Sequence, residues 1–201
     1  MTALRVGLTG GLASGKSTVG RLLRDAGCTV VDADDLVADL YRPGQPGSEA
    51  VRQLFGDEIL TAAGGVDHDA LARRIFADPE ARRRLEAAIH PLVGRRFEQL
   101  AAVRDGIVVF EATLLVESGG GDRFDVLVTV EADPEERLRR AVERGLEPAA
   151  ARARLRAQAT EEERRAAADL VVENDGSLAE LEGEVAELVE ELRRRERSMT
   201  R

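Results

Sequence analysis

A glycine-rich stretch near the N-terminus constrains this chain more than any other feature. Gly10, Gly15, Lys16 and Ser17 fit the pattern G-x-x-x-x-G-K-[ST], the phosphate-binding loop (P-loop) of nucleotide-binding proteins. The motif requires a buried strand before it and a helix after it. Residues 4–9 form a short apolar run, and the apolar residues after Lys16 recur at helical spacing. The stretch therefore predicts a strand, a loop and a helix that together bind phosphate.

Each residue type in this loop has a chemical reason to be there. Glycines let backbone N–H groups approach phosphate oxygens, and the following helix points the positive end of its dipole at the same anion. Lys16 is expected to reach the terminal phosphates of the nucleotide, and the Ser17 hydroxyl to bind Mg²⁺. A glycine-rich turn without a ligand is the alternative, and the complete motif in its proper context disfavours it. The expected nucleotide-binding residues of the loop are Gly11, Ala13, Ser14, Gly15, Lys16, Ser17 and Thr18.

Lys16 is the only lysine in the chain, and every other strongly basic side chain is arginine. A compact ammonium fits a narrow loop where a guanidinium does not. Lys16 is therefore predicted to be catalytic. Its expected place in a surface loop predicts that Lys16→Ala keeps the fold.

Composition excludes several classes of protein. The formal charge of −9 argues against broad binding to nucleic acid or to anionic membranes. The single cysteine, Cys28, excludes an intrachain disulfide and is expected to be a small buried residue in a reducing cytosol. No apolar run approaches the ~20 residues of a membrane span, so a cytoplasmic protein is predicted.

A second buried strand is predicted over residues 28–31, and it leads into Asp32, Asp34 and Asp35. Carboxylates just beyond a strand of an open α/β sheet lie where such sheets bind ligands. Asp32 and Asp34, two apart in an extended segment, are expected to face the same way. Helix capping by at least one of them is the plainer interpretation.

From Tyr41 to about Asp105 the pattern is helices and turns, with Asp78-Pro79 opening one helix. This stretch is interpreted as an insertion that sets acceptor specificity. His90 lies within it, and a lone histidine is more often structural than functional.

The third strand, residues 107–110, ends in Glu111. A carboxylate there is expected to hold Mg²⁺ through water, although capping is an alternative. A fourth strand is predicted over residues 126–130, and Asp133-Pro134 then starts a helix.

The next segment, residues 137–156, is crowded with arginine. It is either a solvated face balanced by glutamates or a lid that closes over phosphates, with a hinge at residues 145–148. The arginines are Arg137, Arg139, Arg140, Arg144, Arg152, Arg154 and Arg156.

A fifth strand is predicted over residues 169–173, and Asn174 follows it, where its amide is able to meet an adenine edge. Capping boxes precede the helices on either side, Thr160 with Glu163 and Ser177 with Glu180. The last helix is expected to pack on the sheet, because its apolar seam is too short for a coiled coil. The oligomeric state is left open, with a monomer favoured.

Several dispersed signatures together resemble the dephospho-coenzyme A kinase family. They are Leu8 to Thr18, Val31 to Asp34, Phe55-Gly56, Leu71 to Phe76, His90-Pro91, Leu114 to Glu117, Gln158, and Ala168-Asp169 leading to Asn174. The resemblance covers nearly the whole chain.

This resemblance implies a P-loop three-layer α/β fold with a five-stranded parallel sheet, a helical acceptor insertion and a helical lid. The implied division is a nucleotide-binding core (residues 1–40, 105–133 and 160–201), an acceptor domain (41–104) and a lid (134–159). The implied reaction is phosphorylation of the ribose 3′-hydroxyl of dephospho-coenzyme A by ATP with Mg²⁺.

Residue roles follow from the same resemblance. Asp34 matches the catalytic base, and Asp32 a neighbour close to the metal and the acceptor. Arg140 and Arg144 match lid positions that meet the transferring phosphoryl group, His90 an acceptor-domain position, and Asn174 the loop beside the adenine.

Two alternatives remain at this level. One is another P-loop kinase acting on a nucleoside or nucleotide. The other is a regulatory P-loop switch, which is disfavoured because no Asp-x-x-Gly follows the third strand and no Asn-Lys-x-Asp guanine reader is present.

Overall fold

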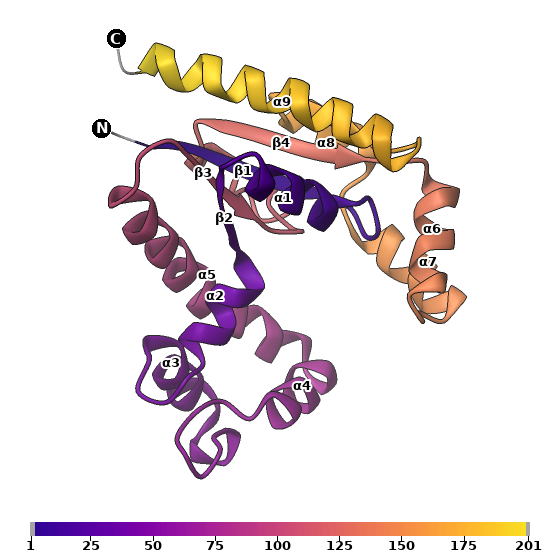
Figure 1. Cartoon of the computed structure of the whole chain (residues 1–201). Coiled ribbons are helices and arrows are strands. Elements are labelled where there is room, and N and C mark those ends of the chain that lie inside the picture. The colour runs from indigo at the N-terminus through magenta and orange to yellow at the C-terminus, as the bar shows by residue number, and fades with distance from the viewer. Residues whose placement is uncertain (1–2, 200–201) are drawn as a thin grey trace. The chain divides into compact units, whose positions relative to one another are not determined.

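The computed structural model describes residues 3–199, and its centre is a five-stranded sheet in the order β2-β3-β1-β4-β5 (Figure 1). β1 pairs in parallel with β3 and with β4, and β4 pairs in parallel with β5. The prediction of a parallel five-stranded α/β fold is confirmed. The strands are β1 (Leu4–Gly10), β2 (Thr29–Asp32), β3 (Ile107–Glu111), β4 (Val126–Glu131) and β5 (Leu170–Glu173).

The three central strands are almost wholly buried because both faces of the sheet are covered. Val6 of β1 lies opposite Val109 of β3 and Val126 of β4, and all three side chains are buried. Helices α1 (Lys16–Asp25) and α9 (Leu178–Met199) pack against this sheet and against each other. Figure 1 shows α9, in yellow, running along the sheet, as predicted for the last helix.

β2 differs from its prediction. Its four residues are half-buried rather than buried, because β2 is an edge strand and has a neighbour on one side only. Cys28, just before it, is 8% exposed and belongs to the apolar core, as expected.

Residues Asp32–Leu100 form one compact unit, and the residues before and after them form the other. The unit of residues 32–100 is mainly helical, and within residues 41–100 its β-structure is limited to one isolated bridge between Leu60 and Val66. Its helices are α2 (Ala33–Leu40), α3 (Pro46–Phe55), a 3₁₀ turn (Asp57–Ile59), α4 (His68–Ala77) and α5 (Pro79–Ala102).

Local signals explain where these helices begin. The Asp78 carboxylate accepts hydrogen bonds from the amides of Glu80 and Ala81, at 2.9 and 3.1 Å, so Asp78-Pro79 opens α5 as predicted. α5 continues through Pro91, which lacks the N–H that this position would otherwise donate.

The second unit carries a helical hairpin after β4, formed by α6 (Pro134–Glu143) and α7 (Pro148–Ala157), which contact each other (Figure 1). Asp133 caps α6, accepting hydrogen bonds from the amides of Glu135 and Glu136. Gly145, with φ +92°, permits the turn between the helices. The chain continues into α8 (Glu161–Ala167), which opens with the predicted capping box of Thr160 and Glu163; a short 3₁₀ turn (Gly121–Arg123) precedes β4.

In the part of the chain that the structure describes, every helix is too short or too polar to traverse a bilayer.

Candidate functional site

The P-loop, residues 10–17, joins the carboxyl end of β1 to the first turn of α1. Ala13 and Gly15 have left-handed backbones, with φ of +59° and +99°, so the chain turns tightly before the helix. Intrahelical hydrogen bonds begin with the amides of Thr18 and Val19, which both donate to Gly15. The amides of Lys16 and Ser17 precede them and are directed out of the helix end. The loop therefore presents N–H groups and a helix dipole to an anion.

The Ser14 hydroxyl is buried in this loop and, among the residues described, is the buried side-chain polar atom without a hydrogen-bond partner. Ser17, in contrast, is exposed on the first turn of α1. A hydroxyl that faces solvent at a helix N-terminus is available to a metal ion or a phosphate.

Lys16 and Glu111 form an ion pair, with 2.8 Å between Nζ and Oε1. The Lys16 side chain is 14% exposed and that of Glu111 is 1% exposed, and Arg24 Nη2 lies 3.9 Å from Glu111 Oε2. The expectation that the Lys16 side chain lies in a surface loop is therefore wrong. Lys16 begins α1 and neutralises a buried carboxylate at the end of β3.

Asn174 joins the loop after β5 to the P-loop. Its side-chain Nδ2 donates to the backbone carbonyl of Ser14 at 2.7 Å. The backbone carbonyl of Asn174 accepts from Arg140 Nη2 at 3.0 Å. A Cβ at Gly15 would lie 2.0 Å from that amide nitrogen, so this close approach requires glycine. The structure brings Asn174, Arg140 and the P-loop together, with Asn174 7% exposed.

Two further side chains hold the P-loop at Leu12, and the sequence interpretation gave neither of them this role. Gln158 Oε1 accepts from the Leu12 amide at 2.8 Å, and Arg137 Nε donates to the Leu12 carbonyl at 3.0 Å. Arg137 is 5% exposed, and burial lowers the pKa of its guanidinium. The local sequence offers no signal that separates this buried arginine from its exposed neighbours.

A buried ion pair lies beside these contacts at the end of β4. Arg164 Nη2 and Glu131 Oε2 are 2.6 Å apart, and both side chains are 1% exposed. The Thr129 hydroxyl donates to Glu131 Oε1 at 2.6 Å, so the carboxylate is satisfied on both oxygens. Burial of a charged pair at this depth is tolerated because its hydrogen bonds are made.

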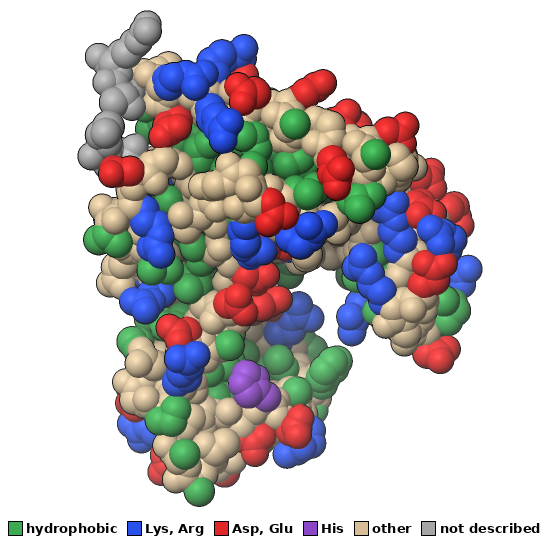
Figure 2. All heavy atoms as spheres, in the orientation of Figure 1, with side chains coloured by type: hydrophobic (Ala, Val, Ile, Leu, Met, Phe, Trp, Pro, Cys, Tyr) green, Lys and Arg blue, Asp and Glu red, His purple; other side chains and the backbone are tan. Residues whose placement is uncertain are grey.

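The other arginines of the hairpin are mainly solvated. Arg139 pairs with Glu136 and Glu143, and Arg140 pairs with Glu136 at 2.8 Å, all within α6. Arg144 is exposed at the carboxyl end of the helix. Figure 2 shows basic and acidic side chains interleaved over this hairpin. The interpretation as a balanced, solvated face is correct for Arg139 and wrong for Arg137.

The prediction that Asp32 and Asp34 lie in one extended segment is wrong. Asp32 ends β2 and caps α2, accepting from the Asp34 amide at 2.7 Å, while Asp34 is already helical. The capping interpretation holds for Asp32, and the carboxylate of Asp34 is exposed on the first turn. His90 is exposed on α5.

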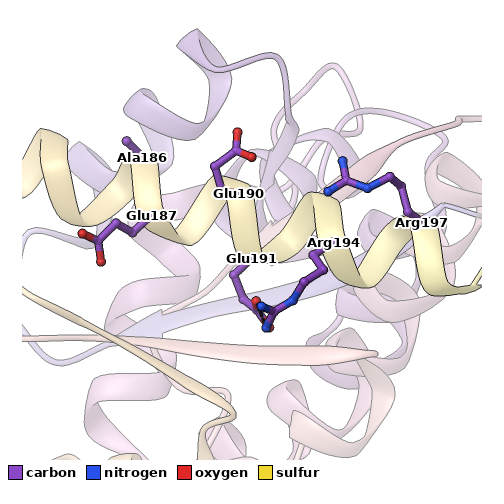
Figure 3. Close-up of a pocket in the computed structure, with 6 residues that line it drawn as sticks. All are labelled: Ala186, Glu187, Glu190, Glu191, Arg194 and Arg197. Carbon is purple, nitrogen blue, oxygen red and sulfur yellow. Dashed lines mark ion pairs between the residues drawn. The ribbon is translucent and has the colours of Figure 1, made fainter.

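A hollow of about 550 Å³ lies on the surface of α9, and no P-loop residue lines it (Figure 3). It includes the surface ion pair of Arg194 with Glu191 and contains none of the residues described above. Within residues 3–199, no three or more His, Cys, Asp or Glu side chains gather as a metal site. The P-loop is therefore the candidate site. The hollow is lined by Ala186, Glu187, Glu190, Glu191, Arg194 and Arg197.

Comparisons with known proteins bear on this site. The sequence profile of the dephospho-CoA kinase family matches residues 4–180. The chain is 46% identical over 191 residues to a dephospho-CoA kinase of Frankia casuarinae, covering 93% of this chain and 82% of that one. It is 42% identical over 195 residues to that of Thermobifida fusca, covering 96% and 98%. A crystal structure of a Thermus thermophilus protein superposes with a TM-score of 0.80 at 40% identity, covering 96% and 99%.

Proposed function

The chain belongs to the dephospho-CoA kinase family and is an ATP-dependent kinase of coenzyme A biosynthesis, and on that premise we propose how its residues divide the reaction. The reaction moves the γ-phosphoryl group of ATP to the ribose 3′-hydroxyl of dephospho-coenzyme A. Phosphoryl transfer requires positioning and neutralisation of charge more than covalent chemistry by the protein.

One observation carries the assignment of the donor side. The left-handed Ala13 and Gly15 turn the chain so that the first amides of α1 and the Lys16 side chain lie at the end of β1. Such an arrangement is complementary to the phosphates of a nucleotide. The P-loop residues Gly11, Ala13, Ser14, Gly15, Lys16, Ser17 and Thr18 are proposed to bind ATP.

Lys16 is proposed to leave Glu111 and to pair with the terminal phosphates when ATP binds. The exchange of one anion for another keeps the ammonium paired, and Arg24, 3.9 Å from Glu111 Oε2, remains as a cation beside the buried carboxylate. Arg140 and Arg144 are proposed to neutralise charge on the transferring group. Asn174 holds the P-loop carbonyl of Ser14 at 2.7 Å and is proposed to border the adenine.

Mg²⁺ enters this proposal with ATP, and the residues present fit it. Ser17 is exposed at the first turn of α1, and the Glu111 carboxylate already faces a cation, Lys16. Mg²⁺ accepts few protein ligands and takes substrate phosphates for the rest. Ser17 would hold the ion directly, and Asp32 and Glu111 through water. When bound, the ion would supply positive charge that offsets the charge of the phosphates.

Acceptor binding is proposed for residues 41–104, with Asp32 and His90 contributing, and the hairpin 134–159 is proposed as the lid. Asp34 is proposed to orient or deprotonate the 3′-hydroxyl. Its carboxylate is exposed on the first turn of α2, where a substrate hydroxyl can reach it.

The test offers the protein ATP and Mg²⁺ with dephospho-coenzyme A, adenosine and nucleoside monophosphates, each alone, and measures product mass. Dephospho-coenzyme A is expected to gain one phosphate. An acceptor of the same structure that lacks the ribose 3′-hydroxyl is the matched control and should gain none. Absence of product with dephospho-coenzyme A would overturn the proposal.

A further inference from the structure

The backbone of Leu12, in the P-loop, is held at both of its polar groups. Its N–H donates to Gln158 Oε1 at 2.8 Å, and its carbonyl accepts from Arg137 Nε at 3.0 Å. Arg137 belongs to α6, and Gln158 directly follows α7. Both ends of the helical hairpin therefore contact the backbone of one residue of the loop. We refer to Arg137 and Gln158 as the Leu12 clamp.

Arg137 approaches the loop so closely that it dictates the neighbouring residue. A Cβ at Gly11 would lie 1.9 Å from Arg137 Nη2 and 2.6 Å from its Cζ. The guanidinium therefore occupies the space that a side chain at position 11 would need. At 5% exposure, Arg137 has little freedom to move away. Its position is thus fixed with respect to the loop backbone.

Gln158 is also fixed, through the residue that follows it. The Ala159 amide donates to Glu117 Oε1 at 2.8 Å, and the Ala159 carbonyl accepts from Arg164 Nη1. Arg164 is in turn held by Glu131 in the buried ion pair at the end of β4. A continuous series of contacts therefore runs from the sheet through Ala159 to Gln158 and the Leu12 amide.

The Leu12 N–H belongs to the Gly11–Leu12 peptide and the Leu12 carbonyl to the Leu12–Ala13 peptide. Because each peptide plane is rigid, the two hydrogen bonds orient the planes on either side of the Leu12 Cα. The second plane leads into the left-handed Ala13, whose backbone directs the amides that follow. We propose that Arg137 and Gln158 are positioning residues for phosphoryl transfer, which preorganise the P-loop amides toward the donor phosphates by clamping the two peptides that flank Leu12. This inference rests on the P-loop being the ATP site of the proposed function.

The distinction between a clamp and a direct charge on the nucleotide is testable with variants of matched shape. In Arg137→Gln, the amide Nε2 stands the same number of bonds from the backbone as the arginine Nε. It can therefore donate to the Leu12 carbonyl without a charge. Arg137→Met fills the same volume and has no donor. Gln158→Met likewise removes the acceptor for the Leu12 amide.

Loss of one clamp hydrogen bond is expected to raise the KM for ATP about tenfold, which corresponds to about 1.4 kcal/mol. Arg137→Met and Gln158→Met should both show this rise while the KM for dephospho-coenzyme A stays within about twofold. In Arg137→Gln, the KM for each substrate should stay within about threefold of that of the parent protein, because the glutamine amide restores part of the lost hydrogen bond. Arg139→Met, on the exposed face of the same helix, is the control and should change neither constant.

Three results would overturn the clamp. Arg137→Gln as impaired as Arg137→Met would show that the guanidinium acts by charge. An unchanged KM for ATP in both methionine variants would show that the contacts with Leu12 do not contribute to ATP binding. Equal loss with both substrates, in step with a loss of folded protein, would show a merely structural role.

A second measurement covers the case in which Arg137→Met does not fold. Gln158 is half-buried, so Gln158→Met tests the other clamp contact to Leu12 with less disturbance to packing. Calorimetry with ADP and Mg²⁺ measures the effect of the clamp on nucleotide affinity without turnover. Failure of the parent protein to phosphorylate dephospho-coenzyme A would thus refute the proposed function, whereas unaltered ADP affinity in Gln158→Met would refute the clamp.

Discussion

The ion pair between Lys16 and Glu111 gives one residue two separable roles, in stability and in catalysis. The perturbation is Lys16→Met, which keeps the volume of the side chain and removes its charge. Glu111 then stays at 1% exposure, and among the residues described Arg24, 3.9 Å away, remains as its paired cation. A buried carboxylate that loses its closest partner destabilises the folded state.

The size of the effect follows from the two distances. With an effective dielectric of about 20, two unit charges attract by about 6 kcal/mol at 2.8 Å and about 4 kcal/mol at 3.9 Å. Arg24 is 44% exposed, so solvent weakens its share. Removing one partner of a buried pair typically costs about 3–5 kcal/mol, and Arg24 offsets part of that, so about 2–4 kcal/mol is expected.

The assay combines urea unfolding with turnover in Lys16→Met, Glu111→Gln and the double variant. The double variant should be more stable than Lys16→Met by about 1–3 kcal/mol, because the unpaired charge is gone. Its turnover should stay about a thousandfold below that of the parent, because an attraction of about 4 kcal/mol to the transition state is still missing. Stability would recover while catalysis would not.

Two outcomes would refute this reasoning. If Glu111→Gln leaves the stability of Lys16→Met unchanged or lowers it further, the carboxylate is not the group that Lys16 neutralises. If the double variant regains turnover, the loss in Lys16→Met came from the unpaired Glu111 and not from the missing ammonium.

Three further predictions use other side chains. Asp34→Asn should lower kcat at least about a hundredfold without changing ADP affinity, whereas Asp35→Asn, its exposed neighbour on α2, should leave kcat unchanged; equal kinetics of the two variants would remove Asp34 from the mechanism. Burial raises the pKa of Tyr41, the only tyrosine, to about 12, so its ultraviolet titration should have a midpoint near that value, and a midpoint near 10 would contradict its burial. Because the folded state keeps this proton to higher pH than the unfolded state, Tyr41 should lower the free energy of unfolding as pH rises from 10 to about 12. Burial also raises the pKa of the Cys28 thiol, so a thiol reagent at pH 8 should modify native protein more slowly than urea-unfolded protein; equal rates would show that Cys28 is accessible.

Local signals were sufficient for most of the elements. The P-loop, the buried strands β1, β3 and β4, and the starts of α5, α6 and α8 all follow from residues within a few positions of one another. Capping, turn formation and hydrophobic periodicity act over that range, so they can be predicted without knowing the fold. The family resemblance supplied the reaction in the same way, from short motifs such as the P-loop and Asp32 to Asp34.

The same local reasoning failed where burial depended on distant segments. The half-buried state of β2 follows from its place at the edge of the sheet, and strand order is not encoded by the apolar run itself. Asp34 was misplaced because the helix begins directly at Ala33, once Asp32 caps it. An N-cap aspartate and an aspartate in an extended segment have the same sequence pattern, so only the backbone conformation distinguishes them.

By itself, then, the sequence determined that this chain has a phosphate-binding loop after its first strand, a helical insertion after the second, and the motifs of one kinase family. Only the tertiary structure decided what holds that loop. Lys16 and Glu111 are 95 residues apart, and Leu12 and Gln158 are 146 apart. Parallel strands bring such segments together because their carboxyl ends share one edge of the sheet, and no spacing within the sequence records which ends become neighbours.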